Sequence, residues 1–232
     1  MTAHLDAICF AALHPAGLAR FWSDVLGRPL VDDPHADAAL APVVEGGYRI
    51  RFRHTTTPKT VQNLAHFDLT STSLEDQQEK VARILELGGK HWDVGQTGDE
   101  GHVVLADPED NEVDVIEPGN NFLKDTGLIG ALAGDGSPAV GQFWSSALGW
   151  PLVWDQDEET AIQSPRGGTK ITWGGPPYGD RTGADRVTFD LAAPAADLDR
   201  LVALGATLVD GPDDRGRYAL TDPDGTPFRV LT

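Results

Sequence analysis

Apolar residues in the first part of the chain follow two different periods, and their order predicts the secondary structure. Residues 5–11, LDAICFA, form a mostly apolar run that is typical of a buried strand. Residues 15–27, PAGLARFWSDVLG, follow with apolar side chains at helical spacing from Leu18 to Val25, a proline at the start and a glycine after the end. This pattern predicts a strand followed directly by a helix.

Three short strands are expected next, at 28–33, 36–43 and 48–55. In the third of these, apolar residues alternate at period two with three arginines, Arg49, Arg51 and Arg53. The same order then begins again, with a strand, a helix and three strands at 64–71, 73–89, 90–94, 101–107 and 111–117. The first half of the chain is therefore predicted to contain two βαβββ units.

The second half of the chain repeats the first. Three motifs recur in similar form: FWSDVLGRPLV at 21–31 and FWSSALGWPLV at 143–153, HFDL at 66–69 and TFDL at 188–191, and LADPEDNEVDVI at 105–116 and LTDPDGTPFRVL at 220–231. The first two recur at one offset, 143 − 21 = 188 − 66 = 122. Such a repeat indicates homologous halves, so the chain is predicted to have four βαβββ units. We expect one domain at 1–118, a linker at 119–126 and a second domain at 127–232.

Charge and composition restrict the partners and the location of the protein. The 232 residues carry a net charge of −18 that is spread along the chain, which argues against a nucleic-acid or anionic-membrane partner. The single cysteine, Cys9, excludes an internal disulfide. No signal segment opens the chain, and no apolar run approaches the roughly 20 residues needed to cross a bilayer. We expect a cytoplasmic protein.

A family resemblance follows from the order of these motifs. Paired βαβββ units, FWSDVLG after the first strand, HFDL before a helix that ends LELGG, and a final DPEDNEVDVIE together resemble the vicinal oxygen chelate superfamily. The nearest likeness is to its glyoxalase-like and bleomycin-resistance-protein-like branch, in tandem form. The resemblance implies an α+β fold with two tandem glyoxalase-like domains, in a monomer or homodimer that binds a small molecule. Each would consist of two βαβββ units that form a cupped, eight-stranded mixed sheet with helices on its outer face.

The resemblance also implies where a metal would bind. Catalytic members of the superfamily hold a divalent ion with His and Glu side chains from several strands of one sheet. The corresponding positions here are Ala7, His66 and Asp114 in the first half, and only the last two carry donor atoms. In the second half they are Thr188 and Arg229, and an arginine would repel the ion. His66 and Asp114 are therefore the candidate catalytic and metal-binding pair.

Other residues are candidates for binding the ligand itself. Arg51 and Arg53 would meet a carboxylate, phosphate or enolate, and we expect them to converge with His66 and Asp114 on one face of one sheet. Alternatively, these arginines belong to an ordinary sheet face and pair with nearby carboxylates. The remaining candidates are aromatic or basic residues expected at the mouths of the cups: Trp92, His102, Trp154, Trp173 and Arg229. The Gly- and Pro-rich segment 174–183 is either a cover for one cup or a simple connection.

Two classes of function stay open, because fold does not determine function in this superfamily. The missing ligand at Ala7 favours a protein that binds a small anionic or aromatic molecule without a complete metal site or another cofactor. The alternative is a metal-dependent lyase, isomerase or dioxygenase, in which His66 and Asp114 help to hold one Mn, Fe, Zn or Mg ion. A metal-free acid–base pair made by the same two residues is a third interpretation.

Overall fold

The computed structural model describes residues 3–95, 97, 100–178 and 185–232. The first half of the chain contains β1 (His4–Ala12), α1 (Pro15–Leu26), β2 (Leu30–Val31), β3 (Ala38–Leu40), β4 (Arg49–His54), β5 (Ala65–Leu69), α2 (Leu74–Glu86), β6 (Lys90–His91), β7 (Val103–Ala106) and β8 (Glu112–Val115). The second half contains β9 (Ile129–Gly134), α3 (Pro138–Leu148), β10 (Leu152–Gln156), β11 (Glu159–Gln163), β12 (Lys170–Trp173), β13 (Val187–Ala192), a 3-10 turn (Ala195–Asp197), α4 (Leu198–Ala203), β14 (Thr207–Asp210), β15 (Arg217–Thr221) and β16 (Pro227–Leu231). The four predicted βαβββ units are confirmed.

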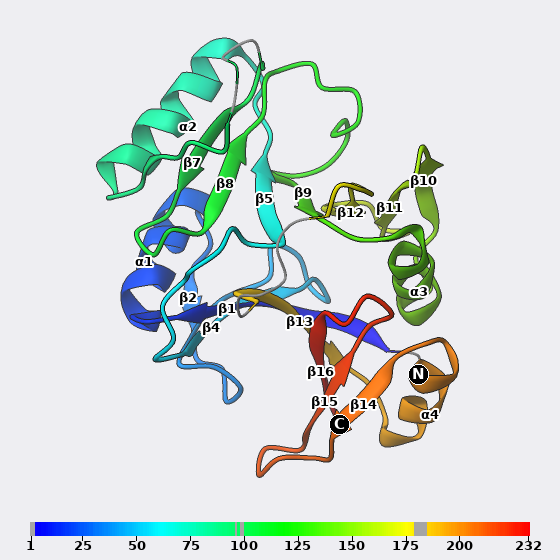
Figure 1. The fold of residues 1–232 in the computed structure, drawn as a ribbon. Helices are drawn as coiled ribbons and strands as arrows, with labels where there is room; N and C mark the ends of the chain where they lie inside the picture. The colour runs from blue at the N-terminus through cyan, green and yellow to red at the C-terminus, as the bar shows by residue number, and fades with distance from the viewer. Residues whose placement is uncertain (1–2, 96, 98–99, 179–184) are drawn as a thin grey trace.

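The strands form two eight-stranded mixed sheets, which confirms the predicted fold class (Figure 1). Sheet A has the order β14-β15-β16-β13-β1-β4-β3-β2, and sheet B has the order β10-β11-β12-β9-β5-β8-β7-β6. Within each unit, the first and fourth strands are parallel neighbours, as in β1 with β4 and β5 with β8. Two units are joined through their first strands, which run antiparallel, as in β1 with β13 and β5 with β9.

The two units of one half do not share a sheet, and here our expectation needs correction. Sheet A combines the first unit with the fourth, and sheet B combines the second with the third. The sequence pattern could not decide this pairing, because the first strand of every unit presents a similar apolar edge to a partner. The halves 1–118 and 127–232 are thus repeats in sequence, and each half contributes one unit to each sheet.

Each half nevertheless builds most of its own hydrophobic core. In the first half, the apolar residues of β4 alternate with the arginines, and Phe10 of β1 packs against Phe52 of β4, Trp22 of α1 and Phe67 of β5. A second cluster gathers around Trp144 of α3 in the other half. The helices therefore cover the apolar face of each sheet. The opposite face of each sheet carries polar and charged side chains, and we call it the polar face.

The repeated Asp-Pro turns tie the helices to the sheets. Asp107, whose side chain is inaccessible to solvent, accepts a hydrogen bond of 3.0 Å from Nε1 of Trp22, and Asp222 accepts one of 3.2 Å from Nε1 of Trp144. Asp107 also accepts hydrogen bonds from the backbone N–H groups of Glu109 and Asn111. Each buried indole thus finds a charged acceptor at the end of the next unit along the chain, which accounts for the recurrence of this motif in both halves.

Replacing Asp107 by alanine should lower the free energy of unfolding by about 3 kcal/mol, because several buried donors would lose a charged acceptor together. Urea denaturation followed by tryptophan fluorescence measures this change. Asp110→Asn is the matched control, since Asp110 lies in the same turn, is exposed, and has a positive φ that asparagine tolerates. A loss below about 1 kcal/mol in Asp107→Ala would show that these bonds do not hold the turn.

Candidate metal centre on sheet B

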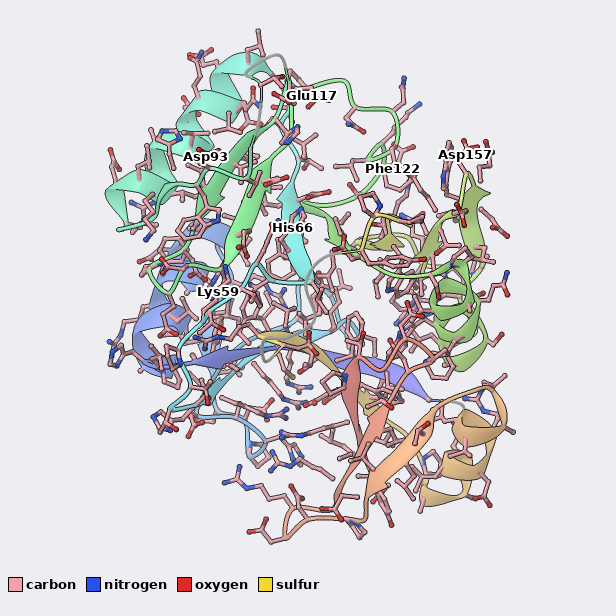
Figure 2. All side chains as sticks on the ribbon, viewed as in Figure 1. Lys59, His66, Asp93, Glu117, Phe122 and Asp157 are labelled. Atoms are coloured by element: carbon pink, nitrogen blue, oxygen red, sulfur yellow. The ribbon has the colours of Figure 1, made fainter. Side chains whose placement is uncertain are left out.

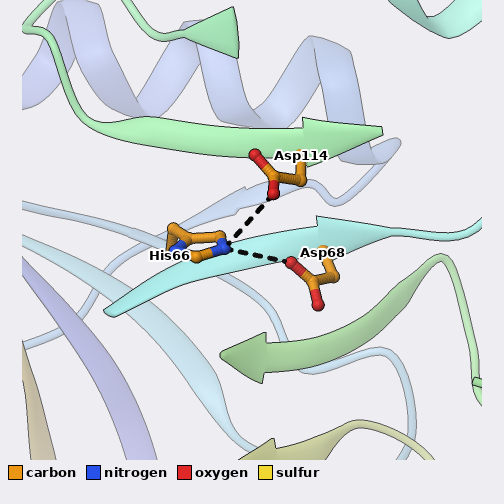
Figure 3. Close-up of side chains that lie close together, drawn as sticks. All are labelled: His66, Asp68 and Asp114. Carbon is orange, nitrogen blue, oxygen red and sulfur yellow. Dashed lines mark ion pairs between the residues drawn. The ribbon is translucent and has the colours of Figure 1, made fainter. Parts of the chain in front are cut away.

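Three potential metal ligands converge on the polar face of sheet B. His66 and Asp68 lie on β5, where residues two apart share a face, and Asp114 lies opposite Asp68 on the parallel strand β8. Nε2 of His66 is 3.3 Å from Oδ1 of Asp68 and 3.5 Å from Oδ2 of Asp114 (Figure 3). One ligand atom from each residue lies within 4.8 Å of the others.

The protonation of His66 depends on these two carboxylates. Burial lowers the pKa of His66, but the carboxylates of Asp114 and Asp68 beside Nε2 outweigh burial and raise this pKa to about 10. In the ion-free protein the imidazole is therefore a cation that balances part of the negative charge. Oδ1 of Asp68 is nonetheless buried without a well-aligned hydrogen bond from any described residue, despite its distance of 3.3 Å from Nε2.

This donor set fits a divalent cation. One imidazole nitrogen and two carboxylate oxygens are ligands that Zn²⁺, Mn²⁺ and Fe²⁺ accept. Donors that share an ion at about 2.0–2.5 Å lie within about 5 Å of one another, as the three atoms here do. Three protein ligands leave coordination positions open for oxygen atoms of a ligand. The three side chains are 14–26% exposed, so the site is accessible from the polar face.

Asp68 was missed in the sequence, whereas His66 and Asp114 were correctly expected to lie together. The family resemblance points only to ligand positions on the fifth and eighth strands of the first half. The missed signal is the period of two in HFDL, which puts the imidazole of His66 and the carboxylate of Asp68 on one face of any regular strand.

His102 lies next to this cluster. Its Nε2 is 3.8 Å from Oδ2 of Asp114, and it lines a hollow of about 570 Å³ together with Trp92 and Glu100. The ring of Trp92 has the ammonium groups of Lys59 and Lys90 at 5.1 and 5.0 Å from its centre. His102 is thus close to the candidate metal centre, while the ring of Trp92 is already in contact with two cations.

Comparison with known proteins agrees with this fold. The sequence model of the family described as "Glyoxalase-like domain" matches residues 7–116 and 132–231. The chain belongs to the glyoxalase-like domain family. A search of curated protein sequences gave no match.

Solved structures show the same fold as this glyoxalase-like protein at low sequence identity. Glyoxalase I from Zea mays is 13% identical, with a TM-score of 0.66 over 99% of this chain and 92% of that one. A putative dioxygenase from Bacillus subtilis subsp. subtilis str. 168 is 15% identical, with a TM-score of 0.56 over 98% and 84% of the two chains. Within the described ranges, this glyoxalase-like protein has no helix that is long and apolar enough to span a membrane.

The two arginines expected beside His66 and Asp114 belong to the other sheet of the glyoxalase-like protein. Arg51 and Arg53 lie on β4 in sheet A, so the predicted convergence of all four residues on one face is wrong. Arg51 is 2% exposed and makes ion pairs of 2.7–2.9 Å with Asp6, Asp33 and Asp190. Arg53 donates to both carboxylate oxygens of Asp190. The structure therefore favours the alternative interpretation, in which nearby carboxylates pair with these arginines.

The remaining candidates are widely separated in the structure. Trp154 is 38% exposed on β10, and its ring contacts that of Phe122 edge-on. Phe122 lies in the connection between β8 and β9 (Figure 2). Trp173 is only 6% exposed and packs in the core, because its side chain points to the apolar face of β12. Arg229 lies on β16 in sheet A. Residues 179–183 of the Gly- and Pro-rich segment lie outside the described residues.

Proposed function

We propose that this protein binds a divalent cation through His66, Asp68 and Asp114, and takes up a small molecule with two adjacent oxygen atoms at that cation. The observation that carries the proposal is Asp68, the third donor. The sequence favoured metal-free binding only because two ligand side chains are too few to hold an ion. Asp68 supplies a third. A cation held there would polarise the oxygen atoms of the ligand, as required of an isomerase, lyase or dioxygenase of this superfamily.

The other residues of the site have separate roles in this proposal. The hollow next to β6 and β7 has a volume in the range of small-molecule sites, and in this proposal it holds the part of the ligand that extends from the cation past His102. His102 lies between this hollow and Asp114. An imidazole in that position can move a proton to or from the ligand near neutral pH.

Metal-free binding is the second candidate function, and the raised pKa of His66 favours it. With the imidazole charged, the three side chains already form an ion-paired cluster without a metal. Such a cluster has little affinity for a neutral chelating molecule. It would instead form hydrogen bonds with the polar edge of a ligand held by contacts elsewhere on the sheet.

Acetohydroxamate, a simple chelator with two adjacent oxygen atoms, distinguishes these functions. In titration calorimetry it should bind saturably to protein that holds one Mn²⁺ per chain, and should not bind to protein dialysed against a chelator. Asp68→Asn should abolish this binding. Asp155→Asn should leave it unchanged, because Asp155 is exposed on β10 at the far edge of the same sheet. Equal binding with and without Mn²⁺, or no binding with it, would contradict the proposal.

A further inference from the structure

Sheet A has a hollow of its own, separate from the candidate metal centre. It has a volume of about 430 Å³ and is lined by residues of β1, β4, β13, β14, β15 and β16, around the place where the first and fourth units meet. Arg186, Thr188 and Arg229 line it together with apolar side chains such as Val209 and Ala219. Its size is within the range of pockets that bind small molecules.

Arg229 has no acidic partner among the described residues, unlike most arginines on this face. Four others are paired with carboxylates: Arg49 with Asp6 and Asp33, Arg51 with Asp6, Asp33 and Asp190, Arg53 with Asp190, and Arg217 with Asp213. Arg229 makes no ion pair or hydrogen bond with any described residue. Its neighbour across the strand pair, Asp190, already pairs with two other arginines. Burial and the nearby charges of Arg53 and Arg217 lower the pKa of Arg229.

Arg186 offers a second unused donor to the same hollow. The residue is 4% exposed, and its Nη1 donates to the backbone carbonyl of Ala11. Its Nη2 is buried and has no hydrogen-bond partner among the described residues. A buried guanidinium N–H without an acceptor is unfavourable by about 1–3 kcal/mol. An acceptor that entered the hollow would remove this penalty.

Charge and shape together specify the occupant. Three arginines, Arg53, Arg186 and Arg229, line the hollow, and Asp185 is the single carboxylate among its described lining residues. Asp190 already neutralises Arg53, so Arg186 and Arg229 are the two of these arginines without a carboxylate partner among the described residues. Guanidinium groups bind carboxylates and phosphates through paired hydrogen bonds.

We propose that this hollow binds a small organic oxyanion, a carboxylate or a phosphate ester, with Arg229 and Arg186 as the donors. The apolar side chains of Val209 and Ala219 accommodate the organic part of the molecule. The duplication thus produced two different sites at corresponding places on the two sheets, one acidic for a cation and one basic for an anion.

Calorimetric titration with inorganic phosphate and with benzoate tests this site. At least one probe should bind saturably at one site per chain, with an affinity that falls as salt is added. Arg229→Gln should weaken that binding about tenfold or more, because a charge-assisted hydrogen bond is lost. Arg229→Lys keeps the charge and should weaken binding less. Arg215→Gln is the matched control, since Arg215 is exposed and does not line the hollow.

Three results would overturn the proposal: no saturable binding of either probe, equal binding by folded Arg229→Gln and the parent, or loss of binding in Asp68→Asn. The third result would move the anion to the candidate metal centre, because Asp68 belongs to sheet B. Failure of the two proposals can therefore be told apart. Should Arg229→Gln melt at a lower temperature than the parent, Arg186→Gln provides an independent loss of one donor.

Discussion

Replacing Arg51 by methionine is expected to lower the free energy of unfolding by about 3–5 kcal/mol, the range found when one partner of a buried ion pair is removed. Arg51 is 2% exposed and pairs with three carboxylates, two of which, on Asp33 and Asp190, are 0–2% exposed. Without the guanidinium, these buried negative charges would repel one another. Since Asp190 belongs to the fourth unit, the substitution would also weaken the contact between the first and fourth units in sheet A.

Urea denaturation, monitored by fluorescence and by far-UV circular dichroism, measures this effect. Arg49→Met is the control, because Arg49 lies on the same strand with a side chain that is 40% exposed, where an ion pair contributes about 1 kcal/mol or less. Equal losses in the two variants, or a loss below about 1 kcal/mol in Arg51→Met, would show that the network around Arg51 does not stabilise the fold.

The secondary structure was predictable because its signals are local. The helices expected at 15–27 and 73–89 are found at Pro15–Leu26 and Leu74–Glu86, since apolar spacing, the first proline and the cap at Ser73 act within a few residues. The pairing of units was not predictable from these signals. Four similar edge strands allow several combinations, and the choice depends on contacts between distant parts of the chain.

The same distinction between local signals and long-range contacts applies to the polar residues on the two sheets. His66 and Asp114 were predictable as neighbours because the first and fourth strands of a single unit are adjacent. The partners of Arg51 were not, because Asp6, Asp33 and Asp190 come from a strand, a turn and the opposite half of the chain. A strand with several arginines resembles an anion-binding site in the sequence, because the carboxylates that neutralise it come from distant parts of the chain.

A divalent cation should bind at His66, Asp68 and Asp114, and substitution of any one of them should weaken its binding more than about 100-fold. Loss of a residue that merely orients a metal ligand already costs about 10–100-fold, and these residues would bind the ion directly. A cation present at about 100 times its dissociation constant should also stabilise the parent protein by about 2.7 kcal/mol. That stabilisation should be absent in Asp68→Asn, while Asp155→Asn should behave like the parent.

Equilibrium dialysis against Mn²⁺ or Zn²⁺, followed by elemental analysis, tests the metal centre most directly. The parent protein and Asp155→Asn should each retain one ion per chain, and His66→Ala, Asp68→Asn and Asp114→Asn should retain almost none at the same free concentration. A parent protein that retains no ion, or an Asp68→Asn variant that retains as much as the parent, would contradict a metal centre at these three residues.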